Sequence, residues 1–397
     1  LILVTQPYGT NMTGEDLTGQ PVLNLKDQYG NLITGDNSSV ITAHISTGTG
    51  GSLSGAIATA SGGVVTFAHL KLVGTPGVSY TLNFTTASIT SADSNAITVT
   101  NNVATQIVLS TSAAGARAGL AFTTQPVITV KDAYGNVVQT GVGSGATITA
   151  SISSGGALVG TASIAANQGV ATFTNLGIGA LSNTYTITYS SDLAQSLNVT
   201  ATQSATVTYG NADHLLMNRQ PVGGKTGDVL TTVPIVYVVD IYGNKVDNST
   251  ASVTAALSSA TAGDVVTGNT VNAVNGVATF TSLNVRTLPG TRTLSFTSTS
   301  LSGVTSASFT ITHADAAKLV LTTQPVGGNA TGDRLTTQPV VEIRDRFDNV
   351  ANSNTDTNRN SHIYSTTITD TDPGGSITFS ASLKVVSSTN PGTTHQP

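Results

Sequence analysis

The stretch "VKDAYGNVV", residues 130–138, joins two apolar runs through an aspartate and a Tyr-Gly-Asn sequence. The same pattern returns as "LKDQYGNLI" at 25–33, "VVDIYGNKV" at 238–246 and "IRDRFDNVA" at 343–351. The aspartates of the four copies lie 105, 108 and 105 residues apart: Asp27, Asp132, Asp240 and Asp345. A motif that returns at a fixed period indicates a tandem array of similar units.

A second motif keeps the same period and predicts a core strand in each of three units. It reads "GGVVTFAHL" at 62–70, "QGVATFTNL" at 168–176 and "NGVATFTSL" at 275–283. We expect its phenylalanines to be core residues, and the residues two places earlier to point the same way. The phenylalanines are Phe67, Phe173 and Phe280, and the earlier residues are Val65, Ala171 and Ala278.

Each unit is about one hundred residues long, which is enough for an independent domain with its own core. A third motif opens the units, as in "LMNRQPVGGKTG" at 216–227 and "LVLTTQPVGGNATG" at 319–332. The predicted domains are residues 1–104, 105–212, 213–316 and a truncated fourth at 317–397. The linkers between them are short, so we expect limited swivel and a rod-like array.

Apolar and polar residues alternate with a period of two in almost every segment, as in "VITAHIS" at 40–46 and "YTLNFTT" at 80–86. Gly, Pro, Asn and Asp interrupt these runs every eight to twelve residues, and no helical stripe is present. The pattern predicts about seven short antiparallel strands per unit. The expected fold class is all-β, with four immunoglobulin-like β-sandwiches in tandem and the last one incomplete.

The repeated aspartate is expected to form a hairpin corner. Gly and Asn tolerate the positive φ angles that tight turns require. Asp132 can accept hydrogen bonds from the amides of its own turn, while Tyr134 is expected to fold over the edge of the sandwich. The residue before the aspartate varies between Lys, Val and Arg, so the motif carries no fixed Lys–Asp pair and no Lys-based crosslink common to all units.

Composition narrows the function classes. Only 9% of residues are charged, the net charge is −5 and there is no cysteine. A nucleic-acid partner is not expected without a basic surface, and disulfides and thiolate metal sites are excluded. No apolar run is long enough to span a membrane. The six histidines share no repeat position and no catalytic motif is present, so we expect neither an enzyme nor a bound cofactor.

The fourth unit contains a polar segment that could bind calcium. Oxygen-bearing side chains alternate in "NSNTDTNRN" at 352–360 and return in "TDTDPGG" at 369–375, with Asp356, Asn358, Asp370 and Asp372 as the candidate ligands. Calcium takes six to eight oxygen ligands. Thr357 and Ile363 stand where an EF-hand loop has glycine and glutamate. A polar, turn-rich loop without metal is the alternative, and it fits the loose spacing better.

The motifs Asp-x-Tyr-Gly-Asn and Gly-Val-Ala-Thr-Phe return at a nearly constant period along the chain, and the resemblance that rests on them covers essentially its whole length. In these motifs the sequence resembles the tandem bacterial immunoglobulin-like repeats of large cell-surface proteins, akin to those of the invasin/intimin family. The resemblance implies an extracellular stalk, adhesin, surface layer or appendage, in which the repeats space and present other parts.

Two function classes remain open. The first is an extracellular structural protein, a rod-like building block of a prokaryotic surface filament, sheath or surface layer. The second is the stalk of a large bacterial adhesin whose binding domain lies outside these residues. The fourth unit lacks counterparts of the strands "RTLSFTS" and "ASFTITH" that close the third. We therefore expect either more chain beyond residue 397 or strands from a neighbouring copy, so that the partner is the same long chain or another copy.

Overall fold

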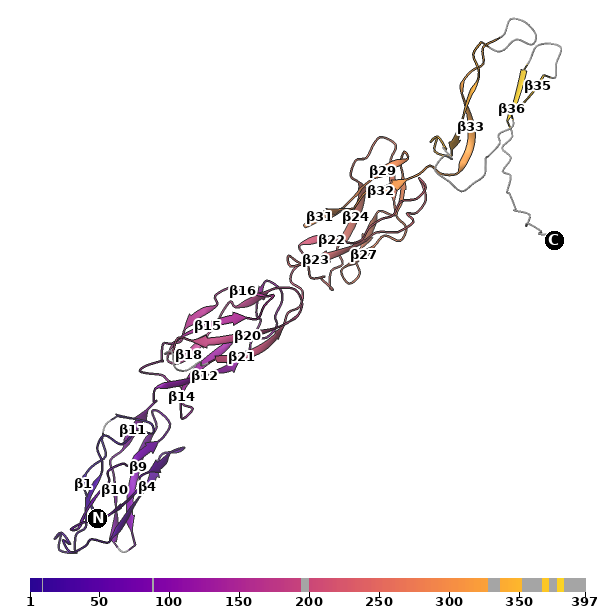
Figure 1. Cartoon of the computed structure of the whole chain (residues 1–397). Helices are drawn as coiled ribbons and strands as arrows, with labels where there is room; N and C mark the ends of the chain where they lie inside the picture. Colours follow the sequence, from indigo (N-terminus) through magenta and orange to yellow (C-terminus); the bar gives the residue numbers. More distant parts are fainter. Residues whose placement is uncertain are drawn as a thin grey trace, which may run out of the picture. The chain divides into compact units, whose positions relative to one another are not determined.

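The computed structural model describes residues 1–8, 10–87, 89–193, 200–327, 336–351, 366–370 and 377–381. The regular elements among these residues are all β-strands, as Figure 1 shows, which confirms the expected all-β class. The chain separates into two compact units, one of Leu1–Asn211 with Asp240–Asn244 and one of Ala212–Val239 with Lys245–Pro397. Over the described residues, the structure contains no helix with the length and apolar character needed to cross a membrane.

The first repeat folds as two main sheets in the first unit. One has the strand order β1-β3-β7, and the other runs β2-β11-β9-β4-β6 with β10 beside β9; β5 and β8 form a separate pair. All pairings are antiparallel except that of β2 with β11. The strands are β1 (Ile2–Thr5), β2 (Thr10–Met12), β3 (Val22–Asn24), β4 (Val40–Thr47), β5 (Ser52–Ser54), β6 (Ile57–Thr59), β7 (Val64–Thr66), β8 (Lys71–Val73), β9 (Ser79–Thr86), β10 (Ile89–Asp93) and β11 (Ile97–Thr100).

The second repeat, also in the first unit, contains a sheet that corresponds to β1-β3-β7, but its other strands form one sheet of three strands and one of four. The strand orders are β12-β14-β18, β13-β19-β16 and β17-β15-β20-β21. The strands are β12 (Ala104–Thr111), β13 (Leu120–Ala121), β14 (Val127–Asp132), β15 (Thr147–Ile152), β16 (Ala157–Val159), β17 (Ser163–Ala165), β18 (Val170–Thr172), β19 (Gly177–Gly179), β20 (Thr184–Ser191) and β21 (Thr200–Thr206).

The third repeat lies in the second unit, apart from its turn at 240–244. A single parallel bridge between β22 and β31 joins its sheets into the path β26-β24-β30-β31-β22-β23-β27, with β25-β28 and β29-β32 as separate pairs. The strands are β22 (His214–Arg219), β23 (Ile235–Val239), β24 (Ser252–Leu257), β25 (Val265–Thr267), β26 (Thr270–Asn272), β27 (Val277–Thr279), β28 (Asn284–Arg286), β29 (Gly290–Arg292), β30 (Leu294–Ser298), β31 (Leu301–Thr305) and β32 (Phe309–Ile311).

The described part of the fourth repeat contains two antiparallel pairs, β33-β34 and β35-β36. The strands are β33 (Ala316–Thr323), β34 (Val340–Asp345), β35 (Thr366–Asp370) and β36 (Ile377–Ala381). The register of β33 on β34 follows that of β12 on β14, with a shift at each end of the ladder.

The prediction of about seven strands per repeat is wrong, because the first three repeats show eleven, ten and eleven strands in the described residues. Left-handed glycines divide the expected strands into three-residue pieces. Gly55, with a φ of +63°, separates β5 from β6, and a Cβ there would lie 2.1 Å from the carbonyl oxygen of His69. Gly160 and Gly268 interrupt the second and third repeats at the same place. Only glycine fits such a left-handed position against another backbone.

The phenylalanines of the second motif are core residues, as predicted. Phe67, Phe173 and Phe280 are 0–2% exposed, and Val65, Ala171 and Ala278 are fully buried beside them. Each ring packs against one aromatic ring of β9, β20 or β30, at centroid distances of 5.4 Å to Phe84, 5.9 Å to Tyr189 and 5.2 Å to Phe296. Tilted pairs at this distance stabilise a core beyond their buried area.

Tyr189 is the exception among these ring partners, since Phe84 and Phe296 carry no hydroxyl. Its Oη is buried without a hydrogen-bond partner in the described structure, and burial raises the pKa of Tyr189. By contrast, the Tyr80 hydroxyl donates to the carbonyl of Thr49 at 3.0 Å and accepts from the amide of Thr75 at 2.9 Å.

We predict that Tyr189→Phe stabilises the second repeat, because it removes an unsatisfied buried hydroxyl whose burial costs about 1 kcal/mol or more. Tyr80→Phe is the matched control and should destabilise the first repeat by about 1 kcal/mol, since its hydroxyl is satisfied. Differential scanning calorimetry of the full chain measures both. Equal destabilisation by the two substitutions would contradict the prediction.

Candidate functional site

The four repeated aspartates occupy the same hairpin corner, as predicted. In each turn, Oδ1 accepts hydrogen bonds from the amides two and four residues later, and Oδ2 accepts one from the Nδ2 of the asparagine four residues later. For Asp132 these distances are 2.9, 2.9 and 3.2 Å. The corresponding distances are 2.9, 2.9 and 3.2 Å for Asp27, 2.9, 2.9 and 2.9 Å for Asp240, and 2.8, 3.0 and 3.0 Å for Asp345.

The residue before the asparagine adopts a left-handed conformation in every turn. It is glycine in the first three repeats, with φ between +84° and +89°, and Asp348 with a φ of +70° in the fourth. Aspartate is among the few residues that tolerate this region, because its short polar side chain can bond locally. The fourth turn therefore keeps the geometry although its sequence reads Phe-Asp-Asn.

In the three later turns, the aspartate accepts one further hydrogen bond, from a linker amide at the end of the preceding repeat. The distances from the linker nitrogen to Oδ2 are 3.0 Å from Asn102 to Asp132, 2.6 Å from Gly210 to Asp240 and 2.9 Å from Ala314 to Asp345. These three aspartates are 0% exposed. Each carboxylate therefore accepts four hydrogen bonds, which fills the acceptor positions of its two oxygens.

The aromatic residue of each later turn contacts the preceding repeat, whereas Tyr134 was expected to fold over the edge of its own sandwich. The ring of each turn packs against a glycine and occupies the space that the Cβ atom of any other residue would need. A Cβ on Gly14 would lie 1.9 Å from the Oη of Tyr134, and one on Gly227 would lie 2.5 Å from the ring of Phe347. Tyr242 occupies the same position over Gly119, at 2.9 Å, and over Gly179, at 2.4 Å.

Gly14, Gly119 and Gly227 have φ angles between +75° and +82°, so both the backbone and the neighbouring ring require glycine. We call these residues the glycine seats. In the first and third repeats the preceding threonine holds the seat in place. The Thr13 hydroxyl donates to the carbonyl of Gly74 at 3.0 Å and accepts from its amide at 2.9 Å. Thr226 makes the same pair of bonds with Thr287, at 2.7 and 3.0 Å.

We use the term joint for one buried aspartate turn together with the linker amide and the glycine seat that it contacts. The three joints differ in the polar groups that surround this common part. In the first, the Asn102 side chain donates to the Thr13 carbonyl at 3.0 Å and to Glu15 at 3.1 Å. In the second, the Asn244 side chain donates to the Ala180 carbonyl at 3.0 Å and accepts from the Ser182 amide at 2.6 Å.

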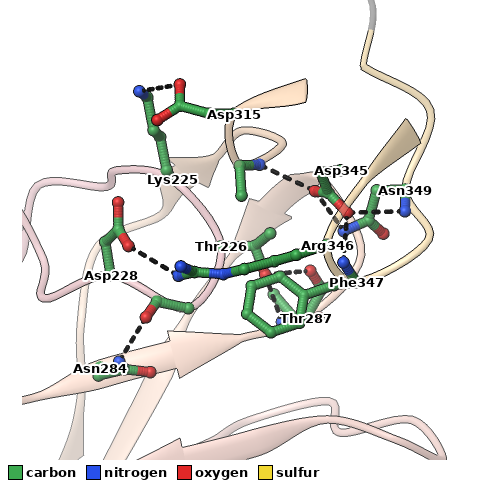
Figure 2. A network of polar contacts seen from close by, with 12 residues as sticks. Lys225, Thr226, Asp228, Asn284, Thr287, Asp315, Asp345, Arg346, Phe347 and Asn349 are labelled. Carbon is green, nitrogen blue, oxygen red and sulfur yellow. Dashed lines mark hydrogen bonds and ion pairs between the residues drawn. The ribbon is translucent and has the colours of Figure 1, made fainter. Parts of the chain in front are cut away.

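The third joint is charged. Figure 2 shows Arg346 lying across the ring of Phe347 and reaching toward Asp228, with Lys225 and Asp315 paired nearby. The Arg346 guanidinium is 4.7 Å from the ring centroid and 3.1 Å from the Asp228 carboxylate. Both ion pairs are largely exposed, so we expect each to contribute little to stability and to weaken in salt. The buried hydrogen bonds of the aspartate are then the stronger part of this joint.

Of the candidate calcium ligands, Asp356, Asn358 and Asp372 lie outside the described residues, and of Asp370 only the backbone position at the end of β35 is described. In the described ranges, no group of three or more His, Asp or Glu side chains is placed to hold a metal ion. The buried aspartates are also poor ligands, because four hydrogen-bond donors already occupy their oxygens.

Sequence reasoning found the turn but missed the groups that it contacts. The missing signal was the constant separation of each linker donor from its aspartate, which is 30, 30 and 31 residues. The donors are an asparagine, a glycine and an alanine, and they bond through the backbone. No side-chain type recurs at these donor positions, so the repeated sequence pattern does not mark them.

No protein-family model matches the chain, and no curated protein matches it. Among solved structures, the adhesin FdeC of Escherichia coli is similar over 78% of this chain and 95% of its own, with 18% identity and a TM-score of 0.34. The S-layer protein SbsC is similar over 96% of this chain, with 14% identity and a TM-score of 0.26, and this chain covers 49% of it. Protocadherin gammaB7 is similar over 86% and 83%, with 13% identity and a TM-score of 0.29. At these identities and TM-scores, the likenesses carry no argument about function.

We predict that Gly14→Ala opens the first joint. The methyl group would collide with Tyr134, which would move away from its seat and expose the bond from Asn102 to Asp132. Gly77→Ala is the matched control, because Gly77 has nearly the same φ (+80° against +82°) and open space where a Cβ would lie. Both variants carry the left-handed strain of about 1–2 kcal/mol. Hydrogen exchange of residues 131–138 should be faster in Gly14→Ala than in Gly77→Ala. Equal exchange in the two variants would contradict the claim that Tyr134 requires a glycine at position 14.

Acid should weaken the second and third joints. Burial is the largest single influence on the pKa of Asp240 and of Asp345 and raises it, but the hydrogen bonds from the turn and the linker together outweigh it, so both pKa values lie below the usual value. A lowered pKa means that the ionised form is stabilised by folding. This stabilisation is fully present above about pH 4, the ordinary aspartate pKa, and is lost as the pH falls through the lower folded pKa.

We therefore predict that the Tm of the full chain falls on acidification below about pH 4, and that the curve of Tm against pH is shallower for Asp345→Asn. Calorimetry over this pH range provides the measurement. If the variant has as steep a curve as the wild-type chain, Asp345 does not contribute to the acid sensitivity.

Proposed function

We propose that this chain is an extracellular structural repeat protein, a building block of a prokaryotic surface filament, sheath or surface layer. The observation that carries the proposal is the joint, which returns three times with the same buried aspartate, linker amide and glycine seat. A chain that only needed to connect domains could use flexible linkers. Joints that bury a carboxylate with all of its acceptor positions hydrogen-bonded support a structural role in which the spacing between repeats is fixed.

The joint restricts the linker through groups that are costly to separate. Breaking the bond from the linker amide leaves a buried carboxylate with an unfilled acceptor position, which costs about 1–3 kcal/mol or more. Moving the aromatic ring away from its seat also exposes apolar surface. We infer that each joint resists bending of the linker. Such resistance is required of a protein that bears tension or sets a spacing.

Composition supports the same role. With only 9% charged residues, the surface of the chain depends on hydroxyl and amide groups for its hydration. Neutral polar groups are less affected by salt than exposed ion pairs. We propose an extracellular location on this basis, and a role that uses neither catalysis nor a cofactor.

The sequence resemblance supports a place among the tandem immunoglobulin-like repeats of bacterial surface proteins. Within this class, we propose that the repeats are of the invasin/intimin type. The principal alternative is an adhesin stalk, which would use the same joints to present a terminal binding domain. The two roles differ in what surrounds the chain on the cell.

Immunogold electron microscopy of native cells tests the proposal, with antibodies raised against residues 1–316. We expect gold particles along a regular surface object, such as a filament or a lattice. Isolated particles at the base of scattered fibrils would favour the adhesin stalk. Labelling confined to the cell interior would contradict both roles.

A further inference from the structure

A cavity of about 340 Å³ lies at the third joint and is lined by both of the repeats that meet there. The third repeat contributes Asp264, Arg286 and Leu288, and the fourth contributes Arg346 and Asp348. The volume is at the lower end of the roughly 300–1,000 Å³ that small-molecule sites occupy. A single sugar-sized group bound there would contact both sides of the joint.

Arg286 supplies this cavity with a cation that no ion pair neutralises in the described part of the chain. The residue is exposed, and its guanidinium donates to the carbonyl oxygen of Gly263 at 3.3 Å and lies 5.7 Å from the ring centroid of Phe347. Arg346, by contrast, is paired with Asp228 at 3.1 Å. A guanidinium has five N–H donors in a planar fork that fits a carboxylate. Arg286 therefore keeps donors for an anion.

The joint does not need an arginine at this position in order to close. Arg286 stands six residues after the motif phenylalanine of its repeat, and the residues at the same place in the first and second repeats are Val73 and Gly179. The first and second joints form the same aspartate turn, linker bond and glycine seat without a cation there. The charge of Arg286 is thus an addition at the edge of a cavity, which points to a ligand.

Two carboxylates in the cavity, those of Asp264 and Asp348, decide which anion fits. Asp264 Oδ2 accepts hydrogen bonds from the amide and the hydroxyl of Thr261 at 2.8 and 3.0 Å, and Asp348 pairs with Lys318 at 2.6 Å. A ligand with several negative charges would be repelled by the two aspartates. They can still accept hydrogen bonds from hydroxyl groups, because an ionised carboxylate has about four acceptor positions. One carboxylate for Arg286 and several hydroxyls for the aspartates are the groups of a hexuronic acid.

We propose that the cavity of the third joint binds one hexuronic acid unit of an acidic polysaccharide. Its carboxylate accepts hydrogen bonds from Arg286, its hydroxyls donate to Asp264 and Asp348, and the apolar face of its ring lies on Leu288, which is 63% exposed. Such a site adds a ligand to the proposed structural function and does not depend on it. Because the two sides of the cavity come from different repeats, the bound sugar also stabilises the closed joint.

An NMR titration of the full chain tests the proposal. The probes are the methyl glycosides of glucuronic acid and galacturonic acid, and the matched ligands are their methyl esters, which keep the ring and the hydroxyls but lack the charge. We expect at least one of the two acids to shift the amides of residues 262–264 and 286–288 saturably, with a Kd on the order of 1 mM. The esters should cause no saturable shift. No saturable shift with either acid, or tighter binding of tetraglutamate than of both, would overturn the inference.

Arg286→Gln should weaken the binding at least about tenfold, because it removes the charged partner of the carboxylate. Arg219→Gln is the matched control, since Arg219 is an exposed arginine of the same repeat that likewise donates to a backbone carbonyl, that of Val233, outside the cavity. Gly227→Ala should also weaken the binding, because its methyl group would displace Phe347 and with it the fourth-repeat side of the cavity. An unchanged Kd in Arg286→Gln or in Gly227→Ala, or an equal loss in Arg219→Gln, would contradict the proposed site.

Discussion

A carboxylate buried at the junction of two repeats must have all of its acceptor positions filled, and the architecture of each joint follows from this requirement. Removing an ionised group from water is costly unless hydrogen bonds replace the hydration. The turn supplies three donors and the preceding linker supplies the fourth, so the carboxylate is satisfied only when the two repeats are together. The aromatic ring of the same turn packs against a glycine of the preceding repeat and leaves no room there for a Cβ atom.

The variation among the three joints shows which features the geometry needs. The aromatic residue is Tyr or Phe, the residue before the seat is Thr or Ala, and the left-handed turn residue is Gly or Asp. The aspartate, the asparagine four residues later and the glycine seat do not vary. What remains constant is the set of four donors and the space for one ring. Among the described residues, the ion pairs of Arg346 and Lys225 belong to the third joint.

The periodic motifs were sufficient to predict the all-β class, the burial of Phe67, Phe173 and Phe280, and the corner at each aspartate. These features depend on local chemistry, namely alternation, turn propensity and core volume. The joint could not be predicted in the same way, because its donor is a backbone amide about thirty residues earlier and its seat is a glycine in yet another motif. Neither residue type signals a binding role by itself. The number of strands was not predicted. A glycine such as Gly55 indicates a turn in the sequence, but the sequence does not show that this turn packs against another backbone and divides one strand into two.

Hydrogen exchange of the linker amides tests most directly whether the buried aspartates hold the repeats together. The amides of Asn102, Gly210 and Ala314 each donate to an aspartate of the following repeat. Resolved by NMR on the full chain near neutral pH, these three amides should exchange at least about a hundredfold more slowly than expected for an unstructured linker, a factor that corresponds to opening free energies near 3 kcal/mol. Exchange at the unstructured rate for all three would mean that the joints are open in solution and that the buried aspartates do not hold the repeats together.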